Sequence, residues 1–261
     1  MKKRTLAVVF VIFLILTYGF GFNLLCSYNL QSTFSVYSFY DEKITPLIVG
    51  VFIAAVTALC IFGGGKRIVK ITGLLVPFMG IIYVLVTILV MILNVTYLPT
   101  VFREIFKDAF DFKSIGAGIA GAEYVQRAMH KTLGNFGPIF ITFAMVLFAF
   151  TTLIGNLYYV DNGLKYLHNE KTPSKLFMTL FHILCIVIFF AGAVTPMDAC
   201  WALADITMGG MAIINIPVCV IMGKKAFLAA KDYELQKKQG IDPVFRASEI
   251  GIDENEVEYW K

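Results

Sequence analysis

Long apolar blocks alternate with short polar segments along the whole chain. Each block holds about the 20 residues that a helix needs to cross a hydrocarbon layer about 30 Å thick. Backbone N–H and C=O groups meet no water in lipid, so the blocks are expected to be α-helices, which satisfy those groups internally. The pattern therefore predicts an all-α, polytopic membrane protein with about six transmembrane helices, over Leu6–Leu25, Leu47–Phe62, Leu74–Leu93, Pro138–Leu157, Leu176–Val194 and Trp201–Met222.

The composition agrees with a membrane protein and excludes an ordinary soluble domain. Of the 261 residues, 58% are hydrophobic and 15% are charged, whereas soluble domains carry about 25% charged residues. The first apolar block follows the basic residues Lys2–Arg4, as in a secretory signal peptide. However, the block is longer than the apolar region of such a peptide, and no A-x-A cleavage site follows it. We therefore expect an uncleaved first span.

Lysine and arginine gather in alternate connecting segments, and this distribution predicts an orientation. The segments between them hold Asp41–Lys43 and the single charge of Asp198. By the positive-inside rule, the basic segments face the cytoplasm, which places both termini there. The basic segments are Lys2–Arg4, Lys66–Lys70, Lys165–Lys175 and Lys224–Lys231.

The blocks divide the chain into four parts. Residues 1–98 form a first membrane segment, and residues 138–222 form a second one. The connection at 99–137 is expected outside the cell, and the helical spacing of apolar residues in Val101–Phe112 predicts an amphipathic helix on the membrane surface. Residues 223–261 are a polar cytoplasmic tail, expected to contain a short helix and a disordered tip.

No motif predicts an enzyme. Gly116–Gly121 matches G-x-G-x-x-G, but dinucleotide binding needs a preceding strand and a following helix, and this stretch lies between a charged segment and an apolar block. The three histidines, His130, His168 and His182, are scattered, and no G-x-S-x-G or H-E-x-x-H occurs. The five cysteines show no metal-binding spacing. The net charge of +4 comes without a basic, aromatic-interleaved patch, so no nucleic-acid partner is expected.

Polar residues inside the apolar blocks are the candidates for a binding site, because they cost free energy unless they face protein or water. Thr151, Thr152 and Asn156 lie beside Gly155 in the fourth block. Their oxygens, with backbone carbonyls, suit a small cation such as Na⁺; alternatively, the threonine hydroxyls bond back to carbonyls of their own helix. In the sixth block, Asp205 and Asn215 either line a cavity or, for Asp205, mark the membrane boundary.

Three stretches resemble one family of membrane transporters. Gly63–Thr72 and the following Leu75–Met79 resemble a GG-x-KRI-x-K-x-T…LVPFM stretch. Phe148–Gly155, with Tyr158 and Tyr159, resembles the signature FAFST-x-x-G-x-x-YY. Trp201–Asp205, with Gly210–Ala212 and Asn215, resembles W-x-LAD…G-x-MA-x-x-N. These three patterns, in this order, are those of the alanine or glycine:cation symporter family.

The resemblance implies the leucine-transporter type of inverted-repeat fold and import of small neutral amino acids, such as alanine or glycine, with Na⁺ or H⁺. It implies a multi-pass protein of a bacterial-type cell membrane, with the coupling ion in place of any cofactor. Thr151 and Thr152 match the paired hydroxyls on core helix eight, where folds of this type bind Na⁺. Asn156, Asp205 and Asn215 are the candidates for lining the substrate cavity.

Parts of the family's pattern are missing. Family members have ten core helices, and the six blocks correspond to core helices three, four, five, eight, nine and ten. The T-x-GTGN-x-G stretch of the broken first helix and the LFSNEAG-x-GS stretch of the broken sixth helix are absent. At Ala122–Val125 the chain passes almost directly to the segment before core helix eight. We therefore predict an incomplete member that does not transport alone. The competing hypothesis is a truncated, non-transporting scaffold or decayed remnant, which docks onto a full-length relative or associates with itself.

Overall fold

The structure is a computed structural model, and it describes residues 4–62, 65–109 and 122–253. Throughout these ranges the regular elements are helices, and no strand occurs in them, which confirms the all-α prediction. The α-helices are α1 (Arg4–Leu16), α2 (Phe22–Ser32), α3 (Thr45–Ile61), α4 (Gly65–Leu93), α5 (Leu98–Ala109), α6 (Ala122–Leu133), α7 (Phe136–Leu167), α8 (Lys175–Val194) and α9 (Met197–Lys238). Three short elements join them: the π-helical turn η1 (Thr17–Gly21) and the 3₁₀ turns η2 (Val95–Tyr97) and η4 (Ala247–Ile250).

Within the described ranges, five helical segments are long and apolar enough to cross a membrane. They are Thr5–Ser32, Thr72–Leu93, Phe136–Leu167, Lys175–Val194 and Met197–Lys238. The remaining predicted span, Leu47–Phe62, corresponds to α3, which is apolar but has only 17 residues. This length is the lower limit for crossing a bilayer. The multi-pass membrane fold is therefore confirmed, whereas a crossing by α3 stays a prediction.

The first span is longer than the sequence pattern predicted. α1, η1 and α2 run on without a break, so the helix ends at Ser32 instead of Leu25. The prediction stopped early because polar residues follow Leu25. Two of them, Ser27 and Gln31, are buried in the protein, as is Asn23 just before Leu25, so these side chains face neighbouring helices instead of lipid. We call this continuous helix the central rod.

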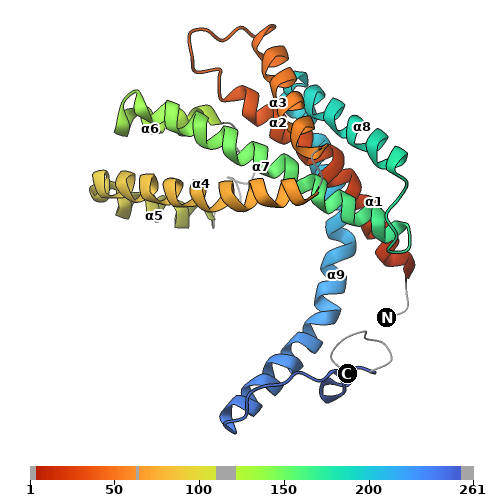
Figure 1. Cartoon of the computed structure of the whole chain (residues 1–261). Helices are drawn as coiled ribbons and strands as arrows, with labels where there is room; N and C mark the ends of the chain where they lie inside the picture. Colours follow the sequence, from red (N-terminus) through yellow and green to blue (C-terminus); the bar gives the residue numbers. More distant parts are fainter. Residues whose placement is uncertain (1–3, 63–64, 110–121, 254–261) are drawn as a thin grey trace.

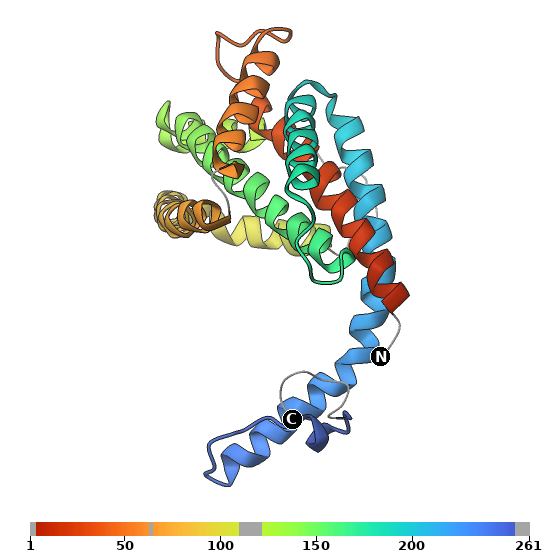
Figure 2. The ribbon, with the colours of Figure 1, turned by 45° about the vertical axis from the view of Figure 1, so that its right-hand side comes forward.

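The central rod holds the bundle together. It packs against α7, α8 and α9, and α3 packs against both α8 and the rod (Figures 1 and 2). The main apolar core joins four of these helices. Its buried members are Leu30, Ile53, Ile61, Ala149, Leu153, Leu157, Cys185 and Phe189. In lipid such contacts stabilise mainly through close packing, because the surrounding acyl chains are as apolar as the side chains.

Glycine allows the closest approach between the rod and α8. A Cβ atom built on Gly192 of α8 would lie 2.5 Å from the carbonyl oxygen of Leu24 and 2.7 Å from its Cα atom. No real Cβ atom is accommodated at such distances from backbone. The missing side chain therefore sets how closely these two helices pack, as small residues do in other membrane proteins.

α4 lies along α7 and away from the rest of the bundle (Figure 1). Most of its apolar side chains are exposed, for example Leu74, Ile81 and Leu85. In a membrane protein such a face meets lipid or another protein segment. α5 and α6 lie beside the far ends of α4 and α7 (Figure 1). The predicted amphipathic helix over Val101–Phe112 is present as α5 up to Ala109, and its last residues lie outside the described ranges.

α6 was not predicted, because it contains no apolar block. A buried polar contact holds it in place. The side-chain nitrogen of Gln126 donates hydrogen bonds to the backbone oxygen of Thr33, at 2.8 Å, and to Oγ1 of Thr142, at 2.9 Å. Gln126 is fully buried. This one residue therefore ties α6 both to the end of the central rod and to α7.

The last helix continues beyond its predicted end. α9 runs through Met222 to Lys238 as one helix of 42 residues, with Pro217 inside it. The separate short helix expected in the tail is therefore the end of α9. Beyond Lys238 the chain turns back toward α9 through η4 (Figure 1). The expected disordered tip falls largely on residues 254–261, and the glycine-rich stretch on 116–121; both lie outside the described residues.

Candidate functional site

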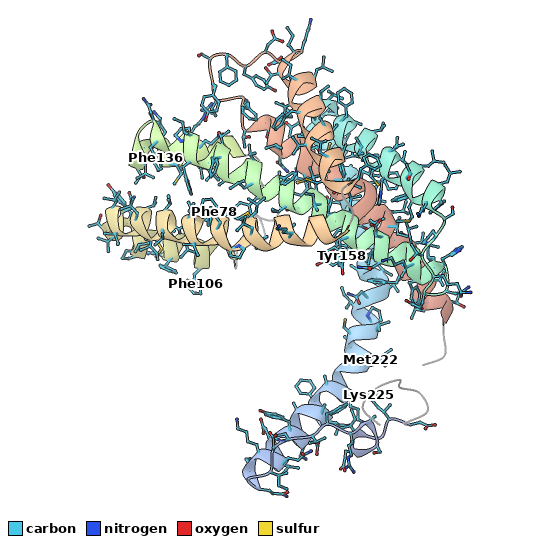
Figure 3. The ribbon with its side chains drawn as sticks, viewed as in Figure 1. Phe78, Phe106, Phe136, Tyr158, Met222 and Lys225 are labelled. Carbon is cyan, nitrogen blue, oxygen red and sulfur yellow. The ribbon has the colours of Figure 1, made fainter. Side chains whose placement is uncertain are left out.

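A groove of about 490 Å³ lies between α4 and α7. Figure 3 shows Tyr158 of α7 where this helix passes α4. The groove contains both threonines that the sequence selected as cation ligands. Its lining comprises Thr72, Val76 and Met79 from α4, and Phe148, Thr151, Thr152, Gly155, Tyr158 and Tyr159 from α7.

Helical spacing brings the α7 residues of the groove to one side. Residues three or four positions apart share a face of an α-helix, and Thr151, Thr152, Gly155, Tyr158 and Tyr159 follow this spacing. Gly155 has nothing within 4 Å of the position that a Cβ atom would occupy. The groove therefore keeps open space next to the threonines and exposes the helix backbone at that turn.

The two threonines differ in what their hydroxyls do. Thr151 is buried, and its Oγ1 donates within its own helix, to the carbonyl oxygens of Leu147 at 3.0 Å and Phe148 at 3.1 Å. This is the back-bonding that the sequence left open as the alternative. Thr152 is exposed to the groove and makes no recorded hydrogen bond with a described residue. Only Thr152 thus offers a hydroxyl that the helix does not already use.

Asn156 lies on α7 but outside the groove. It is 6% exposed, and its side-chain nitrogen donates to Oδ1 of Asn23 in the central rod at 2.8 Å. The amide of Asn23 in turn donates to the carbonyl oxygen of Gly19, at 3.4 Å, inside the π-helical turn η1. The structure therefore places Asn156 in a contact between two helices, and its role in lining a substrate cavity stays a prediction.

The remaining two candidates lie on α9, apart from the threonines. Asp205 and Asn215 are both exposed, and neither lines a described pocket. Oδ1 of Asn215 accepts a hydrogen bond from Sγ of Cys219 at 3.5 Å. The structure thus brings Thr151 and Thr152 together and leaves Asn156, Asp205 and Asn215 at other places. Whether these residues bind substrate stays a prediction.

One polar pair was missed by the sequence analysis. Nε2 of His182 on α8 lies 2.9 Å from Oδ1 of Asp161 on α7, and both side chains are largely shielded. His182 had been dismissed as one of three scattered histidines. The available signal was that both ionisable residues lie within apolar helices, where an unpaired charge is costly and a partner is expected. The pair links α7 to α8 beyond the groove.

A second hollow of about 650 Å³ lies at the other end of the bundle, where α2 ends, α3 begins and α8 passes into α9. Its polar lining includes Gln31, whose Oε1 accepts a hydrogen bond of 2.9 Å from the hydroxyl of Tyr40. Glu42 and Lys43 also line it. The positive-inside rule predicts that this end faces outward, which would open the hollow on the extracellular side.

Comparison with known proteins identifies the family. The sequence profile described as the sodium:alanine symporter family matches residues 1–124 and 117–247, which is most of the chain. The chain belongs to the sodium:alanine symporter family. This confirms the resemblance found in the three sequence stretches. The family is one of transporters and not of enzymes, in agreement with the absence of a catalytic motif.

Individual relatives carry related names. The chain is 28% identical to the amino-acid carrier protein AlsT of Bacillus subtilis, over 95% of this chain and 66% of AlsT. It is 27% identical to the sodium/proton-dependent alanine carrier protein of Bacillus sp. PS3, over 84% of this chain and 68% of that protein. It is 26% identical to the probable sodium/glutamine symporter GlnT of B. subtilis, over 100% of this chain and 68% of GlnT. The chain therefore spans about two thirds of the length of the relatives it matches.

The alignment with GlnT also contains positions without a counterpart in this chain. The alignment with GlnT runs over 332 positions and covers all 261 residues of this chain. The difference, 332 less 261, means that at least 71 positions of GlnT stand opposite gaps in this chain. The two parts of the family match meet at residues 117–124. This is where the sequence predicted that the chain passes over two core helices.

Proposed function

We propose that this chain serves the symport of small neutral amino acids, such as alanine or glycine, with Na⁺ or H⁺ as the coupling ion. Membership of the sodium:alanine symporter family supports this function. So do the names of relatives, which are carriers of alanine and a probable symporter of glutamine. The relatives do not favour the alternative of a remnant without a transport role.

The observation that carries the proposal is the groove between α4 and α7. Thr152 presents an exposed side chain there, two turns before Tyr159 and beside the open space at Gly155. Hydroxyl and carbonyl oxygens are hard ligands, which suit an alkali cation. In this proposal Thr151 and Thr152 provide ligands for the coupling ion, and the same stretch carries the resemblance to the family signature.

The groove is one wall of the ion site in this proposal. A dehydrated cation needs several oxygen ligands, because burying a charge without partners is very costly. Thr151 already donates its hydroxyl hydrogen within α7, so in this proposal it contributes only its oxygen lone pairs. Together, Thr151 and Thr152 provide two hydroxyl oxygens as cation ligands. The substrate carboxylate also needs N–H donors, which broken helices supply in transporters with inverted repeats. The remaining ligands must come from another segment.

A complete relative is the partner that supplies this segment. At least 71 aligned positions of GlnT have no counterpart in this chain, and the two parts of the family match meet at residues 117–124. A second copy of this chain would have the same gap, so it could not provide the missing residues. We therefore propose that the chain acts together with a full-length relative, which packs against the exposed side of α4 and α7.

The ion site is tested in a chimaera, in which the parts of AlsT without a counterpart in this chain are joined to it. Replacing Thr152 by Val keeps the shape of the side chain and removes its oxygen. We expect the Na⁺ concentration for half-maximal alanine uptake to rise roughly tenfold, as for the loss of one polar interaction. Thr87→Val is the control, because Thr87 is an exposed threonine of α4 outside the groove. Equal Na⁺ titrations for both variants would contradict the assignment.

A further inference from the structure

The C-terminal end of α9, which the positive-inside rule predicts to be cytoplasmic, has two faces of different character. Lys225, Ala229, Asp232 and Gln236 are half-buried. The chain covers this face as it turns back, and Gln236 holds it there. The side chain of Gln236 donates to the carbonyl oxygen of Val244 at 3.2 Å and accepts from the Val244 N–H at 2.9 Å.

A second face of the helix, which is exposed, repeats lysine at every seventh position. Lys224, Lys231 and Lys238 are all exposed. Because an α-helix turns by about 100° per residue, seven positions bring a side chain back to within about 20° of its first direction. By the same geometry Phe227, Leu228 and Leu235 lie on either side of the lysines, and they are exposed by 79%, 40% and 49%. We call these six residues the lysine face.

Acidic side chains do not neutralise this face. Asp232 lies on the covered side, where its Oδ2 accepts a hydrogen bond of 2.8 Å from Gln236. Glu234 follows Phe227 by seven positions and so lies at the border of the lysine face. The lysine face therefore has three positive charges and a single carboxylate at its border, so it is positively charged. Exposed apolar side chains beside lysines are unusual for a helix that points only into water, because they gain nothing from that exposure.

We propose that the lysine face binds the anionic headgroups of the membrane surface from which α9 emerges. On an interfacial helix the apolar side chains enter the headgroup region, while lysine stems lie along them and extend the ammonium groups to phosphate. Clusters of basic residues directly after a transmembrane helix attract anionic lipids in the same way. The charge and the apolar flanks of this face both fit such a surface.

The position of the face along α9 also fits a membrane surface. Lys224 follows Met222, the end of the predicted sixth span, by two positions, and Figure 3 shows Met222 and Lys225 where α9 has left the bundle. Lys231 and Lys238 lie about 10 and 21 Å further along the helix. An upright helix would carry Lys238 beyond the reach of the surface charge, about 8 Å at physiological ionic strength.

Binding by all three lysines therefore requires α9 to slant toward the membrane. Pro217 lies in α9 one heptad before Lys224, and a proline inside a helix removes one backbone hydrogen bond and allows a bend. Figures 1 and 2 show the lower part of α9 leaving the bundle at a slant. In the bound state this part lies along the surface with the lysine face toward the headgroups.

Amide hydrogen exchange of the full chain in nanodiscs tests this proposal. The discs contain phosphatidylcholine alone or phosphatidylcholine partly replaced by phosphatidylglycerol. We expect amides over residues 224–238 to exchange several-fold more slowly in the anionic discs, and high salt to abolish the difference. Identical exchange in both kinds of disc would overturn the proposal. The lysine face would then be either solvated or a contact surface for an acidic protein.

Matched lysine pairs locate the effect. Lys224→Gln with Lys231→Gln should abolish the slowing by anionic lipid, whereas Lys225→Gln with Lys237→Gln removes the same charge from other faces and should keep it. Lys224→Arg with Lys231→Arg keeps the charge and should behave like the wild type. If a glutamine pair already exchanges faster in phosphatidylcholine, the substitutions have disturbed its helix. The proposal then depends on the arginine pair, which must keep the slowing by anionic lipid, and on high salt, which must abolish it. Equal losses in both glutamine pairs would mean that net charge, and not the lysine face, attracts the lipid.

Discussion

The side-chain amide of Asn156 on α7 donates a hydrogen bond of 2.8 Å to Oδ1 of Asn23 in the central rod. Asn23 is fully buried and Asn156 nearly so. The pair lies one helical turn after Thr152 on α7, and it fastens the helix that carries the candidate ion site to the centre of the bundle. Because both side chains are buried, loss of one leaves the other without its partner.

Replacing either asparagine by Ala should lower the free energy of unfolding by about 1–3 kcal/mol, the cost of leaving a buried polar group without its partner. The double variant should lose less than the sum, with a coupling energy of about 0.6–1.7 kcal/mol, as measured for hydrogen bonds within membrane proteins. Unfolding in mixed detergent micelles, followed by circular dichroism, measures all four proteins of the cycle. Additive losses would show that the two side chains do not interact.

Gly192 tests the contact between the rod and α8. In Gly192→Ala the new methyl group would meet the backbone of Leu24, and overpacking of this kind costs about 1–3 kcal/mol. Gly209→Ala is the control, because nothing lies within 4 Å of a Cβ atom built there. The melting temperature in detergent should fall for the first variant and stay unchanged or rise for the second. Equal melting temperatures would contradict the close packing of these helices.

The carboxylate of Asp41 gives a prediction for acid pH at the start of α3. Its Oδ1 accepts hydrogen bonds from the N–H groups of Ile44 at 2.9 Å and Lys43 at 2.8 Å, and these bonds hold the pKa of the carboxyl below its ordinary value of 3.8. A lowered pKa means that the stabilisation is present above pH 3.8 and is lost as the pH falls through the pKa of the folded protein. The amides of Lys43 and Ile44 should then lose protection from hydrogen exchange. Protection is measured as the ratio of the intrinsic exchange rate at each pH to the observed rate.

Asp41→Asn is the control for this effect. Asparagine accepts hydrogen bonds without a charge, so protection of the two amides should no longer change with pH in the acid range. A pH dependence that remained in the variant would assign the transition to another group.

The orientation in the membrane is tested by labelling of single cysteines in a background without the five natural ones. Cysteine at the position of Lys43 or Lys107 should react with a membrane-impermeant maleimide added outside intact cells, and cysteine at the position of Lys171 should react only after the membrane is opened. These positions lie before α3, on α5 and between α7 and α8. Labelling of residue 171 from outside would contradict the six-crossing topology.

The sequence predicted most of the membrane helices because a helix that crosses lipid needs a long block of apolar residues, and such blocks are visible in the sequence. Leu176–Val194, for example, agrees with α8 to within one residue. The ends were predicted poorly where polar residues face protein instead of lipid. The rod continues past Leu25 because Ser27 and Gln31 are buried against neighbouring helices, and this burial cannot be seen from the hydropathy of one segment.

The candidate site could be predicted only in part, because contacts between distant helices cannot be seen from the pattern of one segment. Thr151, Thr152 and Gly155 share a helix face, and local spacing was enough to group them. Asn156 is next in the same block, but its partner Asn23 is 133 positions away in sequence, so its inward direction depends on tertiary packing. The contact of His182 with Asp161 was missed because neither residue belongs to a recognisable motif.

The central claim is that the groove of Thr151 and Thr152 is one wall of an ion site that needs helices from a complete relative. Uptake of labelled alanine and glycine into proteoliposomes, with an imposed Na⁺ gradient, tests it most directly. Proteoliposomes with only this chain should accumulate no more label than empty liposomes. Those that hold this chain with a full-length relative made inactive by a substitution in its own copy of the paired threonines should regain gradient-dependent uptake. Gradient-dependent accumulation by this chain alone, or none in the combined proteoliposomes, would contradict the account.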